Sequence, residues 1–380
     1  MPRNWTHLLS TAILLLVPAT AHPQAFDLAA PGWELKGEGA KLETTEGRAV
    51  LALRSGFAYR RDVALEDGTI EFDMKVTGRR SFAYLQFRME SDSEYEEIYF
   101  RPHKTRLPDS LQYNPVYQRA GNWQLYHGPE STAAVELAPD TWLHVRLVLE
   151  GQRAALFLGD AAEPVLLPRL ARPARAGYFA LRGFLPPGEV VPEPPVRFTN
   201  VVVKPGVVGF DFAKAKQEPE VPLAGAVQRW KVSPAFVPAE GPVLAIPTDL
   251  PPRQAWATVA AEPSAQVVLA RHVTLPPKAG RVATAAAITL RAAQAGVRRF
   301  DFAASDEVSV FLNGRLLYTG DQSYSFNFPR RDGLLQLGQE ALYLPLEKGD
   351  NDLVLVVSEV FGGWGLSGRI EDRAGLEISP

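Results

Sequence analysis

The 380-residue sequence contains no cysteine, which excludes several kinds of chemistry at once. Without cysteine the chain forms no disulfide, offers no thiolate nucleophile or thiolate metal ligand, and carries no lipid on a cysteine side chain. Charge is also scarce, since charged residues make up 22% of the sequence and the formal net charge is −3. A chain so close to neutral is not strongly attracted to nucleic acid or to an acidic membrane, so neither is expected as a partner.

Long apolar runs are missing as well. The run at residues 8–17 is about half of the roughly 20 residues that a membrane-spanning helix needs, and no second candidate follows, so no transmembrane segment is expected. With Arg3 before this run and Ala19-Thr20-Ala21 after it, residues 1–21 have the layout of a cleaved signal peptide. We therefore expect a mature chain that starts at His22. Because an exported chain without disulfides suits bacteria, we expect it to be secreted or periplasmic.

Proline is abundant, at 32 of 380 residues, and short segments of alternating apolar and polar residues recur between turn-forming clusters. In residues 68–76 the apolar side chains of Ile70, Phe72 and Met74 share one face, and residues 142–149 repeat this pattern. Such spacing predicts an all-β protein with two β-sandwich (jelly-roll) domains. The expected domains are residues 22–204 and 227–380, joined by a proline-containing and charged linker at residues 205–226.

The second half contains its own strand signals. The alanine-rich residues 281–296 are interpreted as a strand, because valine, isoleucine and threonine are interspersed among the alanines. Asn313-Gly314 follows an alternating segment and predicts a tight type I′ hairpin, whose two central residues both need positive φ. A second hairpin is predicted around residues 348–351, between the alternating leucines of residues 342–346 and 353–357.

Two sets of motifs resemble known families. Residues 95–103 (Tyr-Glu-Glu-Ile-Tyr-Phe-Arg-Pro-His), 112–116 (Gln-Tyr-Asn-Pro-Val) and 142–147 (Trp-Leu-His-Val-Arg-Leu) resemble the concanavalin A-like lectin/glucanase sandwich of exported bacterial proteins, a group that includes 3-keto-disaccharide hydrolase-like and laminin G-like domains. Residues 305–314 and 361–365 are similar to galactose-binding-like jelly rolls appended to carbohydrate-active proteins. The resemblance implies two sandwich folds and a carbohydrate-related role. It implies no catalytic residue, because these folds host many functions.

The pleat of residues 82–103 predicts a ligand-binding face. If Leu85, Phe87 and Met89 face the core, then Tyr84, Gln86 and Arg88 point outward, and the same alternation sends Glu97, Tyr99, Arg101 and His103 outward. Rings stack on the apolar faces of sugars, and planar polar groups bind sugar hydroxyls. We therefore predict an oligo- or polysaccharide ligand bound by Tyr84, Arg88, Glu97, Tyr99, Arg101, His103, Gln112, Tyr113 and Trp123.

Three functions remain open at this point. The first is an exported carbohydrate-binding protein, accessory to glycan degradation or uptake. The second is a glycoside hydrolase or other carbohydrate-active enzyme that uses a glutamate of the first domain. Glu71 and Asp73 resemble the acidic strand of retaining glucanases only incompletely, because Lys75 follows where another acid is expected. The third is a cell-envelope protein-interaction module. A purely structural alternative is an ion-pair ladder of Arg88, Glu97 and Arg101 on a solvated sheet face.

No cofactor or resident metal is expected. The histidines of the mature chain, at positions 22, 103, 127, 144 and 272, include no pair with the spacing of metal ligands on a helix. A structural Ca²⁺ is left open, although no loop is dense in carboxylates. In residues 362–365, Gly-Gly-Trp-Gly, the tryptophan is expected to pack in the core, with a sugar-stacking role as the alternative.

Overall fold

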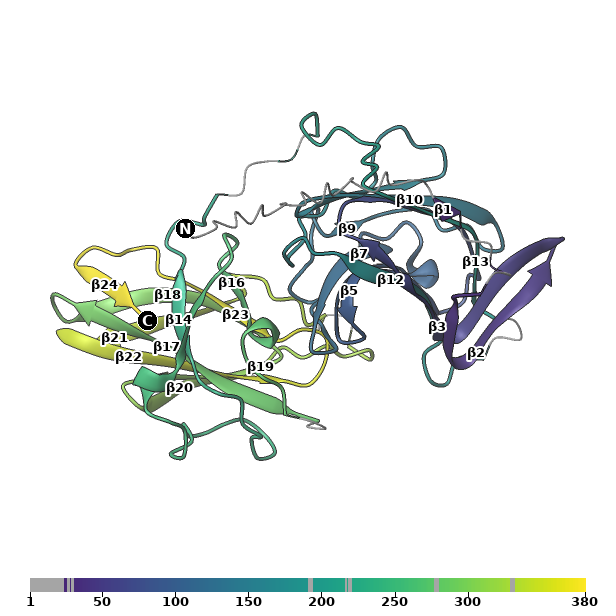
Figure 1. The fold of residues 1–380 in the computed structure, drawn as a ribbon. Coiled ribbons are helices and arrows are strands. Elements are labelled where there is room, and N and C mark those ends of the chain that lie inside the picture. Colours follow the sequence, from purple (N-terminus) through teal and green to yellow (C-terminus); the bar gives the residue numbers. More distant parts are fainter. Residues whose placement is uncertain are drawn as a thin grey trace, which may run out of the picture.

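The computed structural model describes residues 24–25, 28, 31–190, 194–215, 217, 221–276, 280–328 and 332–380. The predicted signal peptide at residues 1–21 and the predicted start at His22 lie outside these residues. As predicted, the described chain is all-β, with three single-turn 3-10 helices among its strands (Figure 1). In this part of the chain no helix combines the length and apolarity needed to cross a membrane.

The first half forms one antiparallel sheet of 13 strands. In chain order these are β1 (Gln24–Ala25), β2 (Glu34–Thr45), β3 (Arg48–Leu65), β4 (Gly68–Val76), β5 (Phe82–Ser91), β6 (Glu94–Phe100), β7 (Leu111–Tyr117), β8 (Ala120–Gly121), β9 (Thr132–Ala133), β10 (Trp142–Glu150), β11 (Arg153–Leu158), β12 (Gly177–Phe184) and β13 (Val196–Pro205), with the 3-10 helix η1 at Pro102–Lys104. The main path runs β11-β10-β4-β13-β3-β12-β5-β6-β7-β8.

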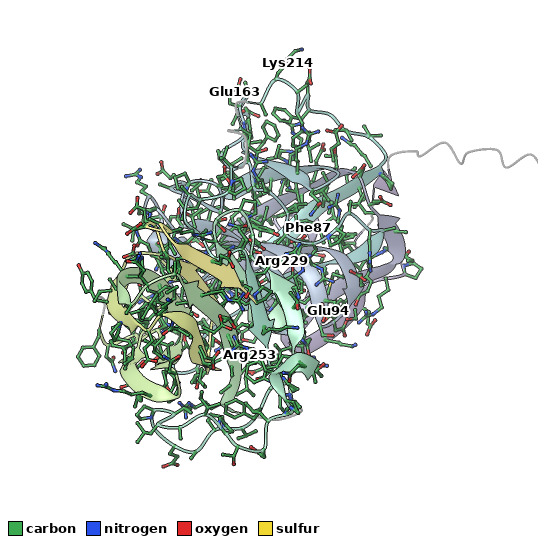
Figure 2. All side chains as sticks on the ribbon, turned by 90° about the vertical axis from the view of Figure 1, so that its left-hand side faces the viewer. Phe87, Glu94, Glu163, Lys214, Arg229 and Arg253 are labelled. Atoms are coloured by element: carbon green, nitrogen blue, oxygen red, sulfur yellow. The ribbon has the colours of Figure 1, made fainter. Side chains whose placement is uncertain are left out.

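The long strand β3 lets this sheet curl into two layers. Its first part pairs with β13 through residues 51–53, and its later part pairs with β12 through residues 56–65. The layer β11-β10-β4-β13 therefore faces the layer β12-β5-β6-β7 across a shared apolar interior. Ile70, Phe72 and Met74 of β4 are buried there, which confirms the predicted alternation of residues 68–76. Figure 2 shows Phe87 within the molecule and Glu163 at its surface.

The second half forms two facing sheets. The seven-stranded sheet contains β14 (Arg229–Val232), β15 (Ala257–Ala260), β17 (Val282–Ala292), β19 (Glu307–Leu312), β20 (Arg315–Asp321), β22 (Gly349–Glu359) and β24 (Leu376–Ser379); the four-stranded sheet contains β16 (Gln266–Val268), β18 (Gly296–Ser305), β21 (Glu340–Leu346) and β23 (Gly365–Arg369), and the 3-10 helices are η2 (Arg253–Ala255) and η3 (Leu269–Arg271). The alanine-rich segment is a strand, as predicted. Asn313 and Gly314 have φ values of 51° and 76°, which confirms the type I′ turn.

The second predicted hairpin is wrong. β21 pairs with β18 in the four-stranded sheet, whereas β22 lies between β17 and β19 in the other sheet. The connection crosses from one layer to the other, and the side chain of Asn351 binds the backbone N–H and C=O of Glu347 to close it. Alternation correctly predicted which side chains point inward, but it carries no information about which layer a strand joins.

The two halves lie side by side, purple to teal on the right of Figure 1 and green to yellow on the left. Their interiors belong to one continuous set of buried side chains that includes Leu125 and Trp364. A Cβ atom on Gly363 would lie only 2.7 Å from Leu125 Cδ1, so this glycine permits the close approach of the halves. Trp364 is fully buried and donates its indole N–H to the carbonyl of Val357, which confirms core packing. Given this continuity, the division into two domains stays a prediction.

Candidate functional site

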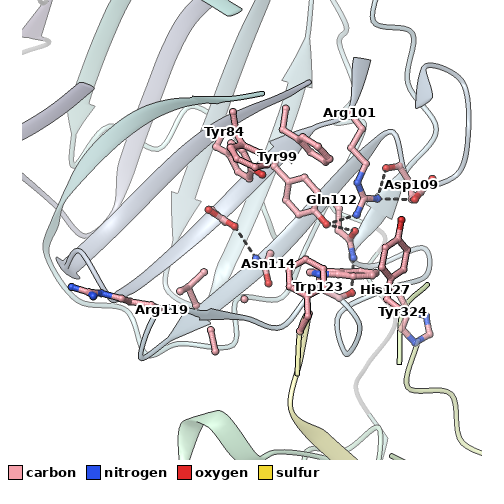
Figure 3. A pocket seen from close by; sticks show the side chains of 18 of the residues that line it. Tyr84, Tyr99, Arg101, Asp109, Gln112, Asn114, Arg119, Trp123, His127 and Tyr324 are labelled. Atoms are coloured by element: carbon pink, nitrogen blue, oxygen red, sulfur yellow. Dashed lines mark hydrogen bonds and ion pairs between the residues drawn. The ribbon is translucent and has the colours of Figure 1, made fainter. Parts of the chain in front are cut away.

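A cavity of about 1360 Å³ lies between the two halves of the chain (Figure 3). Its floor is the outer face of strands β12, β5, β6 and β7, opposite to the face that lines the interior of the first half. Its walls come from the η1 loop and residues 118–128 of the first half and from residues 275–282, 324–334 and 359–362 of the second half, as far as these are described. The curled sheet therefore supplies a polar floor, and the second half supplies part of the walls.

Seven of the nine predicted ligand-binding residues line this one cavity. They come from strands β5, β6 and β7, the η1 loop and the segment after β8, and they are Tyr84, Glu97, Tyr99, Arg101, His103, Gln112 and Trp123. The structure thus brings together residues that lie up to 39 positions apart in the sequence. Their role in binding a ligand stays a prediction.

Arg88 lies on the other face, so its predicted outward position is wrong. The pairing of β5 with β6 shifts register between Phe87 and Ser91, and Arg88 itself has a φ of 49°. Because of this bulge, the side chain of Arg88 points to the opposite face of the sheet from the one that strict alternation predicts. Arg88 is 3% exposed and donates to the carbonyl of Glu66 and the carboxylate of Asp67, at 2.7 and 3.1 Å. Met89, predicted to face the core beside Leu85, packs instead with aromatic side chains on the outer face.

Tyr113 is the second predicted residue that the cavity does not include. It alternates with Gln112 along β7, so its ring points into the interior of the first half and is fully buried. Its hydroxyl donates to the carboxylate of Glu96 and accepts the backbone N–H of Ala171 at 2.7 Å. Tyr113 therefore satisfies the hydrogen bonding of the buried Glu96 carboxyl and the Ala171 N–H in the core. The prediction that it faces the ligand is wrong.

The outer face is covered, not solvated, and the alternative of an ion-pair ladder is excluded there. Gln86 is 0% exposed, and Glu97 and Tyr99 are each 4% exposed. Glu97 accepts hydrogen bonds from Asn114 at 2.7 Å and from Gln86 at 3.0 Å, both of them side-chain amides. Arg88 is on the opposite face, and Arg101 pairs with Asp109 at 2.7 Å.

A chain of hydrogen bonds connects the floor to the wall. Arg101 donates to the hydroxyl of Tyr99 at 2.5 Å, and this hydroxyl donates to Oε1 of Gln112 at 2.6 Å. The Nε2 group of Gln112 then donates to the backbone carbonyls of Trp123 at 2.8 Å and Tyr126 at 2.6 Å. The segment that carries Trp123 is thereby fixed to strand β7, and the site is largely preorganised.

Burial sets the ionisation of two cavity residues. It raises the pKa of Glu97, and Arg182 together with the amides of Gln86 and Asn114 opposes that shift. Burial, with Lys104 and other cationic neighbours, lowers the pKa of His103 to about 4. His103 is therefore neutral near pH 7, and its ring packs edge-on against Phe82 at 5.2 Å. Neutral His103 adds a hydrogen-bonding ring to the cavity and no charge.

The second half contributes aromatic side chains that the sequence analysis missed. Tyr324 contacts Trp123 edge-on, with ring centroids 5.5 Å apart, and Phe361 lies 6.3 Å from the same tryptophan. Phe326 lies under the guanidinium of Arg80 at 4.2 Å. Phe326 and Phe361 are more than half exposed. The signal was present, since aromatics recur at every second position of residues 324–328, but no sequence rule connects them to strands more than 200 residues earlier.

The second half also contributes the carboxyl of Glu359, which lies near that of Asp306. Glu359 lines the cavity, and its Oε2 atom is shielded from solvent without a hydrogen-bond partner among the described residues. Burial and the neighbouring carboxyl of Asp306 raise the pKa of Glu359 well above its ordinary value. Asp306 itself accepts the backbone N–H groups of Val360 and Phe361 at 2.8 and 2.9 Å, which fixes the turn that carries Phe361.

The incomplete acidic motif lies away from the cavity. Glu71 is paired with Lys204 at 2.8 Å, and Asp73 contacts His144 at 2.8 Å and Asn200 at 2.6 Å on the outer side of the β10-β4-β13 layer. Neither carboxyl lines the cavity. In the part of the chain that the structure describes, no three histidine or carboxylate side chains are grouped closely enough to hold a metal ion.

Comparisons with known proteins give only remote likenesses. No protein-family model matches the chain, and no curated protein matches it. Similar solved structures include the carbohydrate-binding module CBM66 from Bacillus subtilis, with 17% identity over 46% of this chain and 95% of the module and a TM-score of 0.35. They also include the β-glucanase of Bacillus licheniformis, with 13% identity, 50% and 99% coverage and a TM-score of 0.37. A third is the Crh5 transglycosylase, with 12% identity, 49% and 85% coverage and a TM-score of 0.38. At this similarity the ligands and reactions of these proteins do not transfer.

Proposed function

We propose that this chain is an exported saccharide-binding protein, accessory to the degradation or uptake of a glycan, and that its ligand occupies the cavity between the two halves. The observation that supports this most is the composition of the lining. Tyrosine and tryptophan rings stand beside carboxamide, carboxylate and guanidinium groups, as in Tyr84, Trp123 and Asn114. A saccharide site needs aromatic rings as well as polar groups, because each sugar ring has an apolar face and a rim of hydroxyl groups.

The size of the cavity favours an oligosaccharide over a single sugar. Its volume of about 1360 Å³ exceeds the roughly 300–1,000 Å³ of sites for drug-sized ligands. The accessible rings are also spread from the floor, at Tyr84, to the rim, at Trp123 and Phe361. Several stacking positions along one cavity suit a chain of linked sugars.

Replacing Tyr84 by alanine is expected to weaken glycan binding about 3- to 10-fold, as loss of a single stacked ring does. The ring of Tyr84 is half-buried, lies 5.5 Å from that of Tyr99 and lines the floor. The measurement is a glycan array followed by calorimetric titration of the tightest binder with both proteins. Tyr343→Ala, which removes an exposed tyrosine outside the cavity, serves as the control and should retain wild-type affinity. Equal affinity of the Tyr84→Ala variant and wild type would place the ligand elsewhere.

The enzymatic alternative is supported by one specific observation. Glu97 from the first half and Glu359 from the second half line the same cavity, and burial raises the pKa of both. Glycoside hydrolysis uses two carboxyls, one held protonated as a general acid by a raised pKa and the other ionised as the nucleophile or general base. Release of reducing ends from the tightest-binding glycan, lost in both Glu97→Gln and Glu359→Gln with binding retained, would establish the enzyme. Binding of the glycan without release of reducing ends would support a binding protein over an enzyme.

A further inference from the structure

The described lining of the cavity that we propose as a saccharide site has one more cationic side chain than carboxyls. Its described lining contains five cationic side chains, namely Arg80, Arg101, Lys104, Arg119 and Arg182. Four carboxyls face them, namely Glu97, Asp109, Asp332 and Glu359. Arg101 and Lys104 share the single carboxylate of Asp109. A neutral saccharide does not need this excess of cations.

Arg182 is held by aromatic stacking and not by an ion pair. Its guanidinium lies over the rings of Tyr84, Phe57 and Phe184, at 4.5, 5.0 and 5.5 Å from their centroids. Within the described structure it forms no hydrogen bond and no ion pair, although the side chain is half-buried. Stacking fixes the plane of the guanidinium and leaves its N–H donors unused.

Other buried arginines of the same half do form ion pairs. Arg88 is bound to Asp67 at 3.1 Å. Arg172 is bound to Glu90 and to Glu94, both at 2.7 Å. The nearest acidic neighbour of Arg182 in the cavity is Glu97, whose oxygens already accept from Gln86 and Asn114. Arg182 is therefore a preoriented, unpaired cation on the floor of the cavity.

We propose that the cavity selects an acidic saccharide and that Arg182 pairs with a carboxylate on that saccharide, as in a uronic acid. A guanidinium and a carboxylate are both planar and form two parallel hydrogen bonds, so a guanidinium fixed in plane by stacking is suited to this group. The half-buried ring of Tyr84 beside it then contacts the sugar. The inference rests on the proposed saccharide site and adds the charge of its ligand.

The test compares acidic oligosaccharides with their carboxyl-reduced counterparts, in which each carboxylate is replaced by a neutral hydroxymethyl group. Oligomers of galacturonate, glucuronate and mannuronate, the reduced forms of each and a sulfated oligosaccharide are titrated into the mature full-length chain. We expect at least one acidic oligomer to bind about 10- to 100-fold more tightly than its reduced form, the range for a charge-assisted pair.

Arg182→Gln should lower the affinity for that acidic oligomer to within about threefold of the reduced form, and Arg182→Lys should recover part of the difference. Arg229→Gln is the charge-matched control, because Arg229 is exposed on β14 and outside the cavity (Figure 2). It should bind like wild type. Thermal unfolding of each variant confirms that the fold is intact.

The outcomes separate the two proposals. Reduced oligomers that bind as tightly as acidic ones, or a preference for the acid that Arg182→Gln leaves unchanged, overturn the carboxylate assignment while saccharide binding stands. A preference for the sulfated oligosaccharide over every carboxylate also overturns it. Binding of no saccharide in this panel or in the wider array overturns both the assignment and the proposed function.

Discussion

Replacing Gln112 by leucine is expected to lower the free energy of unfolding by about 3–5 kcal/mol. Gln112 is 2% exposed and makes three hydrogen bonds, with the hydroxyl of Tyr99 and the carbonyls of Trp123 and Tyr126. Leucine has a similar volume but leaves both carbonyls buried without a partner, at about 1–3 kcal/mol for each unsatisfied group, and removes the acceptor of the Tyr99 hydroxyl, which keeps its bond from Arg101. Because residues 123–126 can relax in part, the expected loss of unfolding free energy is smaller than the sum of the costs for the individual groups.

Urea denaturation of wild type and variant measures this loss. Gln152→Leu is the matched control, because Gln152 is exposed and donates a single hydrogen bond, to the carbonyl of Leu170 at 3.1 Å. We expect that control to cost less than about 1 kcal/mol. Since Gln112 fixes the position of Trp123, the variant should also bind the array glycan more weakly. Equal stability losses for the two variants would contradict the role assigned to Gln112.

Glu96→Gln is expected to abolish much of the loss of stability that the protein shows as the pH rises from about 4.5 to 8. Glu96 is fully buried on the core face of β6, where burial raises the pKa of its carboxyl from 4.5 to about 7. The folded protein thus keeps a proton that the unfolded chain releases. The resulting stabilisation is complete below the unfolded pKa and is lost as the pH rises through 7. A shift of this size corresponds to about 3 kcal/mol.

The measurement is the free energy of unfolding at pH 4.5, 6 and 8 for wild type, Glu96→Gln and Glu163→Gln. Other buried carboxyls with raised pKa values, such as Glu97 and Glu359, contribute in the same direction in all three proteins. The difference between wild type and Glu96→Gln therefore isolates Glu96. Glu163 is exposed, so its variant should follow the wild-type slope. Parallel curves for wild type and Glu96→Gln would contradict the raised pKa.

Alternation along single strands made much of the fold predictable. Residues 68–76 and 142–149 form strands β4 and β10 with the expected side chains buried, because one face of each strand packs against an apolar interior. The same rule placed Tyr84, Glu97 and Tyr99 together. It applies to β12 too, where Phe179 and Leu181 face the core and Arg182 faces the cavity, although that strand was not identified from the sequence.

The errors arose where the chain departs from strict alternation or where distant segments meet. The bulge at Arg88 requires a positive φ at an ordinary residue, which no residue type in that segment indicates. The layer change between β21 and β22 depends on tertiary pairing. The contribution of Tyr324, Phe361 and Glu359 to the cavity depends on how the halves pack, so the sequence predicted an open face where the structure has a partly open cavity.

The most direct test of the central claim is a crystal structure of the mature chain with the saccharide that binds most tightly in the array. We expect its density in the cavity between the β12-β5-β6-β7 face and the second half, with a sugar ring on Tyr84 or Trp123 and hydrogen bonds to Glu97 or Asn114. Density on another surface, such as the outer side of β4 around Glu71, together with a cavity free of saccharide, would contradict the claim.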